Sequence, residues 1–267
     1  MSLTNILAEI LKDLTIERPD AQAVHVIQAI GSSSISKGQA FSMGSYAECY
    51  TDPTVDLIYI GTPQAFHKPF TLNARDGREA MWTRFFPLTQ ALQRVLHQDK
   101  IVSDIIRVFA DFTLDMHVKS MGPESRLKNR VLGAGSLLDI GIYSLTWGLL
   151  CLDQNIAEKA EKPKVVSFQT LEQGVDIGSK GTIFIEGNGT SCPSFTFVPK
   201  NKDEEEKLFE FDNPGSGFFY ESDAVALDIH ARRMENAVMP WEETIRVLEV
   251  MDAIRYANGG LFPQDEE

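Results

Sequence analysis

The sequence predicts an α/β protein in which a truncated, Rossmann-like parallel sheet is followed by an α+β domain with a mostly antiparallel open sheet. Two observations predict this class. In the first half, segments with helical apolar spacing alternate with β-branched runs, as in parallel sheets joined by crossover helices. Between residues 165 and 198, β-branched runs and glycines without helical spacing indicate antiparallel strands. We therefore expect a degenerate dinucleotide-binding domain at residues 1–77 and a substrate and dimerisation domain at residues 78–267.

The N-terminal elements follow from the spacing of apolar residues. Residues 3–14 place leucine and isoleucine on one helical face, which predicts an amphipathic helix. Residues 23–30 form a buried, β-rich run, and a short helix is expected from Ser34. A second β-rich run at residues 55–60 ends at the turn formed by residues 61–63. Helix and strand therefore alternate as a parallel sheet requires.

The later elements are mostly helical. Apolar spacing predicts helices at residues 87–97 and 137–152, with a strand at residues 105–112 between them. After the antiparallel region, two further helices are expected at residues 220–233 and 241–257. An α+β half thus follows the parallel half.

Composition excludes several classes of partner. The chain has 25 Lys and Arg against 38 Asp and Glu, a formal net charge of −13, which disfavours nucleic acid and anionic membrane surfaces. Its three cysteines are widely spaced and form neither a disulfide framework nor a paired metal motif, so no metal site is expected. No membrane-spanning run or signal sequence is recognisable, and we expect a cytoplasmic protein.

Several stretches occur in an order typical of one protein family. They are residues 56–63 with His67, 78–85, 133–143, 217–221 and 238–244. These stretches resemble the glucose-fructose oxidoreductase and inositol dehydrogenase superfamily (Gfo/Idh/MocA). Within that superfamily they look most like the NADP-dependent trans-dihydrodiol and D-xylose dehydrogenases.

The resemblance implies a two-domain enzyme. The family pairs a Rossmann domain with a domain whose open sheet forms one wall of the substrate site and often the dimer interface. Its chemistry is hydride transfer between nicotinamide and a sugar or diol carbon. A Lys from a Glu-Lys-Pro motif and a Tyr or His from an Asp-x-x-x-Tyr/His segment handle the proton. Asp139 and Tyr143 match that second segment, although a buried, structurally hydrogen-bonded tyrosine is an equally good interpretation.

The chain also departs from the family pattern. It contains no G-x-G-x-x-G loop, which a pyrophosphate needs because it binds bare backbone amides. Ser33 stands where the branch carries an Arg for the 2′-phosphate. Residues 62–74 are followed almost at once by residues 78–82, where the family has a strand and the Glu-Lys-Pro motif, and residues 174–181 join two contracted strands. We therefore expect that neither NAD(H) nor NADP(H) binds and that no cofactor is used.

These departures lead to a prediction of function. We expect a cofactor-independent enzyme, of the redox-neutral cyclase, pericyclase or isomerase type, acting on a small and largely apolar molecule. The alternatives are an NADP-dependent dehydrogenase of a sugar or diol, and a non-catalytic partner or regulator of an intact paralogue. The catalytic candidates are Tyr143, Asp139 and His67. The candidates for substrate binding are Phe66, Trp82, Arg84, Phe85, Phe112, Phe218, Phe219 and Tyr220.

Apolar residues in the antiparallel region also predict a homodimer through the C-terminal sheet. A sheet face is stable in water only when it is polar or covered. The apolar residues concerned are Val165, Phe168, Ile183, Ile185, Phe195 and Phe197.

Overall fold

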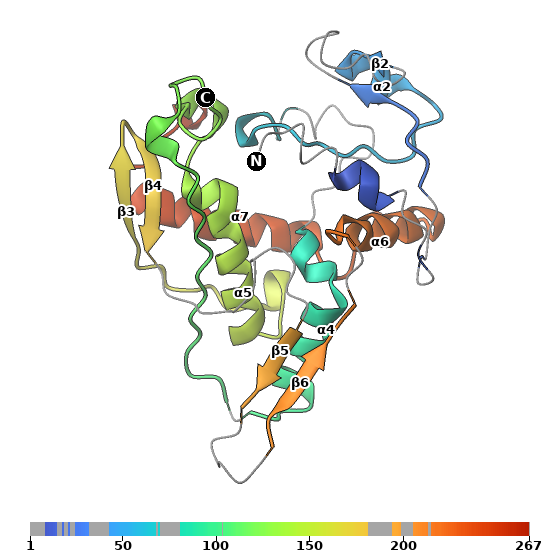
Figure 1. Ribbon diagram of the computed structural model, residues 1–267, viewed down its shortest axis with the longest axis vertical. Coiled ribbons are helices and arrows are strands. Elements are labelled where there is room, and N and C mark those ends of the chain that lie inside the picture. The colour runs from blue at the N-terminus through green and yellow to red at the C-terminus, as the bar shows by residue number, and fades with distance from the viewer. Residues whose placement is uncertain are drawn as a thin grey trace. The chain divides into compact units, whose positions relative to one another are not determined.

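The computed structural model describes residues 9–14, 18, 21, 25–31, 43–67, 69, 81–102, 104–180, 194–198, 205–212 and 215–266 (Figure 1). Helices and strands both occur in this part of the chain, which confirms the mixed α/β class. The helix expected from Ser34, together with Ile183 and Ile185, lies outside the described residues.

The chain divides into two compact units. Unit 1 comprises Met1–Thr62, Phe66–Ala80 and Pro214–Ala237, and unit 2 comprises Pro63–Ala65, Met81–Asn213 and Val238–Glu267. The sequence predicts a single boundary after residue 77, whereas residues 214–237 group with the N-terminal residues. A segment from the C-terminal part therefore completes unit 1. The functional division into domains 1–77 and 78–267 stays a prediction.

Unit 1 contains a short parallel pair and its helices. β1 (Ile30–Gly31) pairs in parallel with β2 (Met43–Gly44), and α2 (Tyr46–Thr51) follows directly. Residues 9–14 are helical, in agreement with the helix predicted there, and α6 (Phe218–His230) is the longest described helix of the unit. The pair is parallel, but its second strand lies at residues 43–44 and not at the predicted residues 55–60, and the Rossmann-like detail stays a prediction.

Two predicted strands are not formed. Residues 55–60 and 104–112 have no regular secondary structure, and residues 25–29 precede the short β1 rather than forming a strand with it. An extended segment becomes a strand only when a neighbouring strand exchanges backbone hydrogen bonds with it. No such partner lies beside these segments in the described part of the chain, and Ile106 is 92% exposed.

The helices predicted for unit 2 are confirmed. α4 (Pro87–Gln93) begins at a proline in its first turn and continues into the π-helical turn η4 (Arg94–Gln98). The apolar segment at 137–152 consists of the π-helical turn η7 (Leu137–Gly141) and α5 (Ile142–Leu152). α7 (Trp241–Ala257) matches its predicted bounds and contacts α5 (Figure 1).

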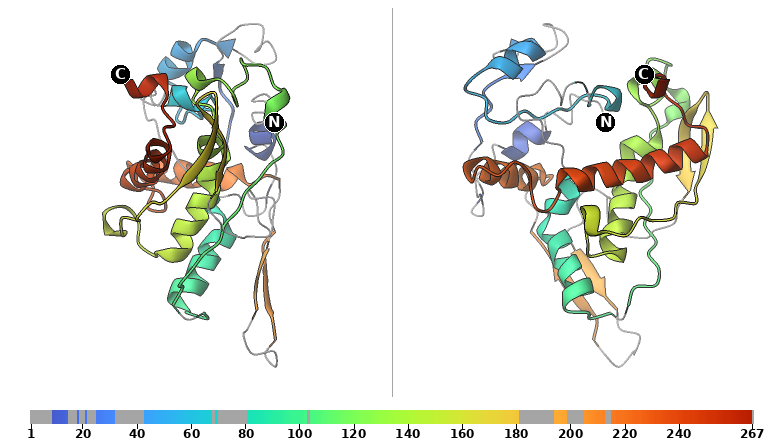
Figure 2. Two further views of the ribbon diagram at one scale, coloured as in Figure 1. Left: turned by 90° about the vertical axis from the view of Figure 1, so that its left-hand side faces the viewer. Right: turned by 180° about the vertical axis from the view of Figure 1, so that it is seen from behind.

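Antiparallel pairing is found as predicted, but the described strands of this region form two separate two-stranded sheets and not one open sheet. β3 (Phe168–Glu172) pairs with β4 (Val175–Lys180), with a register shift between Thr170 and Leu171. Gln173 and Gly174, which join these strands, both have positive φ, as the favoured two-residue hairpin turn requires. β5 (Ser194–Phe197) pairs with β6 (Lys207–Glu210), and this pair extends beyond the helices of unit 2 with α4 beside β5 (Figure 2).

Among the described residues, the core of unit 2 contains two apolar clusters. One joins α4, α5 and the β5–β6 region, and the other joins η7, α5 and α7. The buried members of the first are Leu88, Ala110, Trp147 and Leu150, and those of the second are Leu137, Leu149, Val247 and Met251.

Short turns complete unit 2 and position the site. These are η3 (Trp82–Phe85), η5 (Val118–Ser120), η6 (Arg130–Leu132), η8 (Ala157–Lys159) and η9 (Pro263–Glu266), and η2 (Gln64–Phe66) lies at the unit boundary. By length and composition alone, Arg130–Leu152 could cross a membrane. Its residues Thr146–Cys151 are buried in unit 2, which favours a core helix.

Candidate functional site

Tyr143 lies at the start of α5 among aromatic side chains. The Trp82 indole Nε1–H donates to the Tyr143 hydroxyl oxygen at 3.2 Å. The rings of Trp82 and Phe112 meet the Tyr143 ring edge to face, with centroids 6.4 and 5.6 Å away. Three of the predicted residues therefore come together.

The contact with Trp82 fixes the direction of one hydrogen bond of the Tyr143 hydroxyl group. An indole nitrogen only donates hydrogen bonds, so the phenol oxygen is the acceptor in this pair. The phenol hydrogen must then be donated to an acceptor other than Trp82. A hydroxyl that accepts one hydrogen bond becomes a better donor in the next. In its neutral form, Tyr143 is thus suited to donate a hydrogen bond to an oxygen atom of a ligand.

Asp139 lies one turn before Tyr143, within η7. Its Oδ1 accepts hydrogen bonds from Arg126 Nη1 and, at 3.3 Å, from Gln64 Nε2. Its Oδ2 has no hydrogen-bond partner among the described residues, and the side chain is 16% exposed. π-Helical turns of this kind are rare and occur frequently at functional sites. The site therefore pairs a carboxylate anchored at one oxygen with a phenol.

Arg84 belongs to a buried ion network instead. Its guanidinium, 2% exposed, pairs with the fully buried carboxylate of Glu243. Glu243 also accepts from Arg246 Nε at 2.7 Å and from the backbone N–H of Ala157 at 2.8 Å. Burial lowers the pKa of Arg84, against the opposing effect of Glu243. These contacts favour a structural role for Arg84 rather than substrate binding, and the neighbouring Phe85 is 4% exposed, as a core residue is.

The remaining predicted residues belong to unit 1. His67 donates from Nε2 to the Thr62 carbonyl oxygen at 2.8 Å, which fixes the loop that follows residues 55–60. Phe219 is fully buried beneath the Arg18 guanidinium, 3.6 Å from the ring centroid. Its neighbours Phe218 and Tyr220 are partly buried in the same helix, α6, while Phe66 is 37% exposed.

The sequence analysis missed two buried acids in unit 1. The Asp13 carboxylate, fully buried, accepts from the backbone N–H groups of Ser216 and Phe218, each at 2.9 Å. Asp223 accepts from Arg18 Nη2 at 2.8 Å and pairs with His25 Nε2 at 2.7 Å. An acid within an otherwise apolar helical pattern, and a G-x-G run just before a helix, are the signals that could have indicated the first of these contacts.

The backbone N–H groups of Ser216 and Phe218, here called the amide cradle, resemble in type the groups that bind a dinucleotide pyrophosphate. Gly215 and Gly217 have φ of 74° and 87°, and such glycine-rich turns at a helix start are suited to phosphate. The Asp13 carboxylate already occupies the amide cradle, so the cradle does not fit a dinucleotide pyrophosphate. Among the described residues there is also no group of three or more His, Cys, Asp or Glu that could hold a metal ion.

The known proteins to which this chain is similar are named dehydrogenases. No family model matches the chain. The chain is 25% identical to D-xylose 1-dehydrogenase (NADP(+)) of Hypocrea jecorina, over 90% of this chain and 85% of that protein. It is 27% identical to the trans-1,2-dihydrobenzene-1,2-diol dehydrogenase of Homo sapiens, over 91% of each, and 26% identical to that of Sus scrofa, over 94% of each. These similarities confirm the resemblance to the trans-dihydrodiol and D-xylose dehydrogenases.

The alignment with the fungal protein contains long gaps. It extends over 334 residues, whereas 90% of this 267-residue chain is about 240 residues. The difference, about 90 aligned positions, has no counterpart in this chain. This supports the contractions inferred from the sequence.

The comparisons correct two predictions. The expectation of a cofactor-independent, redox-neutral cyclase or isomerase is wrong, because the relatives across nine-tenths of the chain are named dehydrogenases. The expectation that no cofactor is used is also wrong, since the fungal relative is named for NADP(+). Short missing motifs are thus a weaker guide to activity than similarity along nine-tenths of the chain.

Proposed function

We propose that this chain is an NADP-dependent dehydrogenase acting on a hydroxyl-bearing carbon of a sugar or a small diol. The observation that carries the proposal is the similarity, over about nine-tenths of the chain, to dehydrogenases named for D-xylose and for a dihydrobenzene diol. NADP(+) as hydride acceptor rests on the name of the fungal relative, and no described residue is assigned to it.

Tyr143 is the proposed acid–base residue. Oxidation of an alcohol to a carbonyl removes a proton from its oxygen, and a correctly placed tyrosine in its phenolate form can receive that proton. The indole N–H of Trp82 donates to the Tyr143 oxygen at 3.2 Å, a contact that would stabilise the negative charge of the phenolate. In the reducing direction, the same hydroxyl donates to the carbonyl oxygen.

Asp139 and the neighbouring aromatic rings are the proposed substrate-binding groups. Oδ1 of Asp139 is held by Arg126 and Gln64, which leaves Oδ2 to accept a hydrogen bond from a second hydroxyl of the substrate. The rings of Trp82 and Phe112, which meet Tyr143 edge to face, would pack against the C–H groups of the same molecule. A vicinal diol offers one hydroxyl group to Tyr143 and one to Asp139, which agrees with the sugar or diol substrate that the similarities suggest. The predicted homodimer, the cytoplasmic location and the Rossmann-like sheet are further proposals that await their own tests.

Turnover with a panel of substrates tests the proposal. Pentoses, hexoses and cyclic trans-diols are each mixed with the protein and NADP+ or NAD+, and the absorbance of the reduced cofactor is followed. We expect turnover with NADP+ for at least one of these classes. Absence of turnover with either cofactor, together with absence of binding by calorimetry, would show the proposal to be wrong.

A phenol-to-phenyl change then tests the residue assignment. Tyr143→Phe removes the proton carrier and keeps the ring, so kcat should fall by about 10²–10⁴-fold. Tyr59→Phe, at a tyrosine that is 48% exposed in unit 1, removes a hydroxyl of the same kind and should leave kcat unchanged. Equal kcat values for Tyr143→Phe and the unaltered chain would remove Tyr143 from the mechanism.

A further inference from the structure

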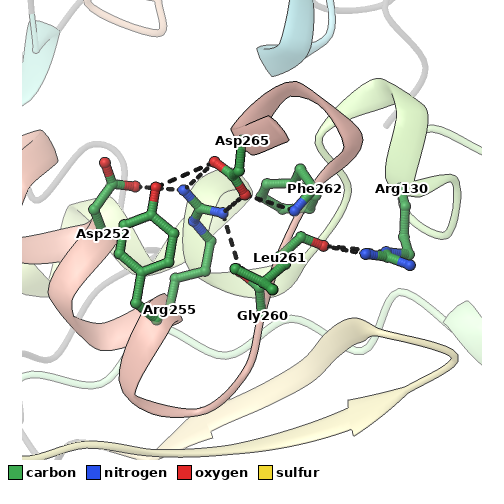
Figure 3. Close-up of polar contacts among 8 residues, drawn as sticks. Arg130, Asp252, Arg255, Gly260, Leu261, Phe262 and Asp265 are labelled. Atoms are coloured by element: carbon green, nitrogen blue, oxygen red, sulfur yellow. Dashed lines mark hydrogen bonds and ion pairs between the residues drawn. The ribbon is translucent and has the colours of Figure 1, made fainter. Parts of the chain in front are cut away.

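The last residues of the chain are bound tightly to unit 2. Residues 260–266, here called the C-terminal latch, follow α7 and end in η9. Arg255, near the end of α7, and Asp265 of the latch form the centre of a dense polar cluster (Figure 3). Phe262 of the latch is buried, and the Arg255 guanidinium lies 4.8 Å from the centre of its ring.

Asp265 satisfies four donors at once. Arg255 contributes Nη1 to Oδ2 and Nη2 to Oδ1, the latter at 2.9 Å. The Tyr256 hydroxyl donates to Oδ1 at 3.2 Å, and the Phe262 backbone N–H donates to Oδ2 at 2.6 Å. Hydrogen bonds from Arg255, together with those from the other donors, hold the pKa of Asp265 below its usual range. The carboxylate therefore closes residues 262–265 onto the end of α7.

The latch also contacts η6, which precedes the candidate site. The Arg130 guanidinium donates from Nε and Nη2 to the Leu261 carbonyl oxygen (Figure 3). Gln264 Nε2 donates to the Val131 carbonyl oxygen at 2.9 Å. Arg130 additionally packs against the β3–β4 turn, where a methyl group on Gly174 would lie 3.1 Å from its side chain. Three segments of unit 2 thus meet at η6.

Only four residues separate η6 from the π-helical turn that carries Asp139. The first, Gly133, has φ of 70° and is pressed against residues 64 and 65, since a Cβ there would lie 3.0 Å from the Ala65 nitrogen. The second, Ala134, is 2% exposed, and the carbonyl of the third, Gly135, accepts from the Asp139 N–H. This linker has little room to absorb a displacement of η6.

We propose that Asp265 is a positioning residue that, through the latch and η6, fixes the π-helical turn of Asp139 and the start of the Tyr143 helix. The catalytic part of this inference rests on the proposed function. The mechanical part concerns backbone order in residues 133–143 and does not depend on any substrate.

Hydrogen exchange of the backbone amides tests the mechanical part. Asp265→Asn removes the charge that binds Arg255, and exchange in residues 133–143 should accelerate about tenfold or more, as loss of a charged hydrogen bond implies. Asp252→Asn is the matched control, because Asp252 also accepts from Arg255 Nη2, at 2.7 Å, but lies outside the latch. Exchange in residues 133–143 should be unchanged in this control.

A second variant keeps the test decisive if Asp265→Asn does not fold. Gln264 is exposed, so Gln264→Ala breaks the tether to the Val131 carbonyl without disturbing the core. It should also accelerate exchange in residues 133–143, and Asp265→Glu should restore part of the protection lost in Asp265→Asn. If Gln264→Ala and any folded Asp265→Asn accelerate exchange only within residues 255–266, the proposal is overturned.

Kinetics separate positioning from general stability. If the chain turns over substrate, Asp265→Asn should lower kcat several-fold with KM nearly unchanged, whereas Asp252→Asn should change neither value. A chain with the expected exchange pattern but no turnover would contradict the proposed function and leave the latch intact. Normal turnover in the unaltered chain, with hydrogen exchange in residues 133–143 unchanged in the variants, would contradict the latch proposal and leave the proposed function intact.

Discussion

Both units are built around a fully buried carboxylate, but the two acids are satisfied by different partners. In unit 1, Asp13 accepts backbone N–H groups at the start of α6. In unit 2, Glu243 lies between two guanidinium groups, those of Arg84 and Arg246. The amides of unit 1 carry partial charges, whereas the cations of unit 2 carry full charges that burial has removed from water.

The difference predicts how each unit responds when its acid is lost. Removing Asp13 leaves polar N–H groups at a helix end, where water can replace the carboxylate. Removing Glu243 leaves two like charges, 2% and 8% exposed, without their counter-ion. Breaking a buried pair in this way costs more than the pair itself contributes. Unit 2 should therefore be the more sensitive of the two.

The largest effect is expected for Glu243→Gln, which keeps the side-chain volume but removes the charge. We expect a loss of about 3–5 kcal/mol in the free energy of unfolding of unit 2. The three tryptophans of the chain, Trp82, Trp147 and Trp241, all lie in unit 2, so their fluorescence in a urea titration reports on this unit. Glu242→Gln, at the exposed neighbouring residue, should change the free energy by less than about 0.5 kcal/mol.

Acid provides a second measurement on the same carboxylate. Burial acts to raise the pKa of Glu243, but hydrogen bonds from Arg246 and Ala157 outweigh it, and the pKa lies below its ordinary value. The unfolded chain then binds protons more tightly, so this stabilisation is complete above the unfolded pKa of about 4.3 and is lost as the pH falls through the folded value. Glu243→Gln should show a flatter dependence on acid pH, and equal slopes in both proteins would contradict the assignment.

The same contrast explains how much could be predicted from the sequence. Helices of unit 2 such as 241–257 were predictable because apolar spacing is a local property that burial then reinforces. The strand expected at 105–112 was not formed, since a strand depends on a distant partner that the sequence pattern does not reveal. In the site, Tyr143 and Asp139 were recognisable by their motif, whereas Arg126 and Gln64, which hold Asp139, approach it from separate segments with no local signal.

An intermediate effect is expected for Asp13→Ala in unit 1. Two partly buried N–H groups lose a charged acceptor that water replaces only in part, so we expect a loss of about 2–3 kcal/mol confined to unit 1. Hydrogen exchange in α6 measures this loss, and the tryptophan transition of unit 2 should stay in place. Glu9→Gln is the control, because its contact with the Ser216 hydroxyl is long, at 3.4 Å, and peripheral. If the tryptophan transition moves as far as the exchange does, the two units do not unfold separately.

The smallest effect tests whether Pro63–Ala65, which interrupts unit 1 in the sequence, packs as part of unit 2. Gly133 and Gly259 have φ of 70° and 73°, so a change to Ala at either position forces the same left-handed backbone and costs about 1–2 kcal/mol. The two positions differ only in their surroundings. A Cβ at Gly133 would lie 3.0 Å from the Ala65 nitrogen, whereas a Cβ at Gly259 meets nothing within 4 Å.

Gly133→Ala should therefore lower the free energy of unfolding of unit 2 by about 1 kcal/mol more than Gly259→Ala, because backbone atoms cannot move aside as a side chain can. The tryptophan-monitored urea titration measures both variants. An equal loss in the two would mean that residues 63–65 are not held against Gly133. The contact that joins this short N-terminal piece to the Asp139 and Tyr143 region would then be too loose to align Gln64 with Asp139.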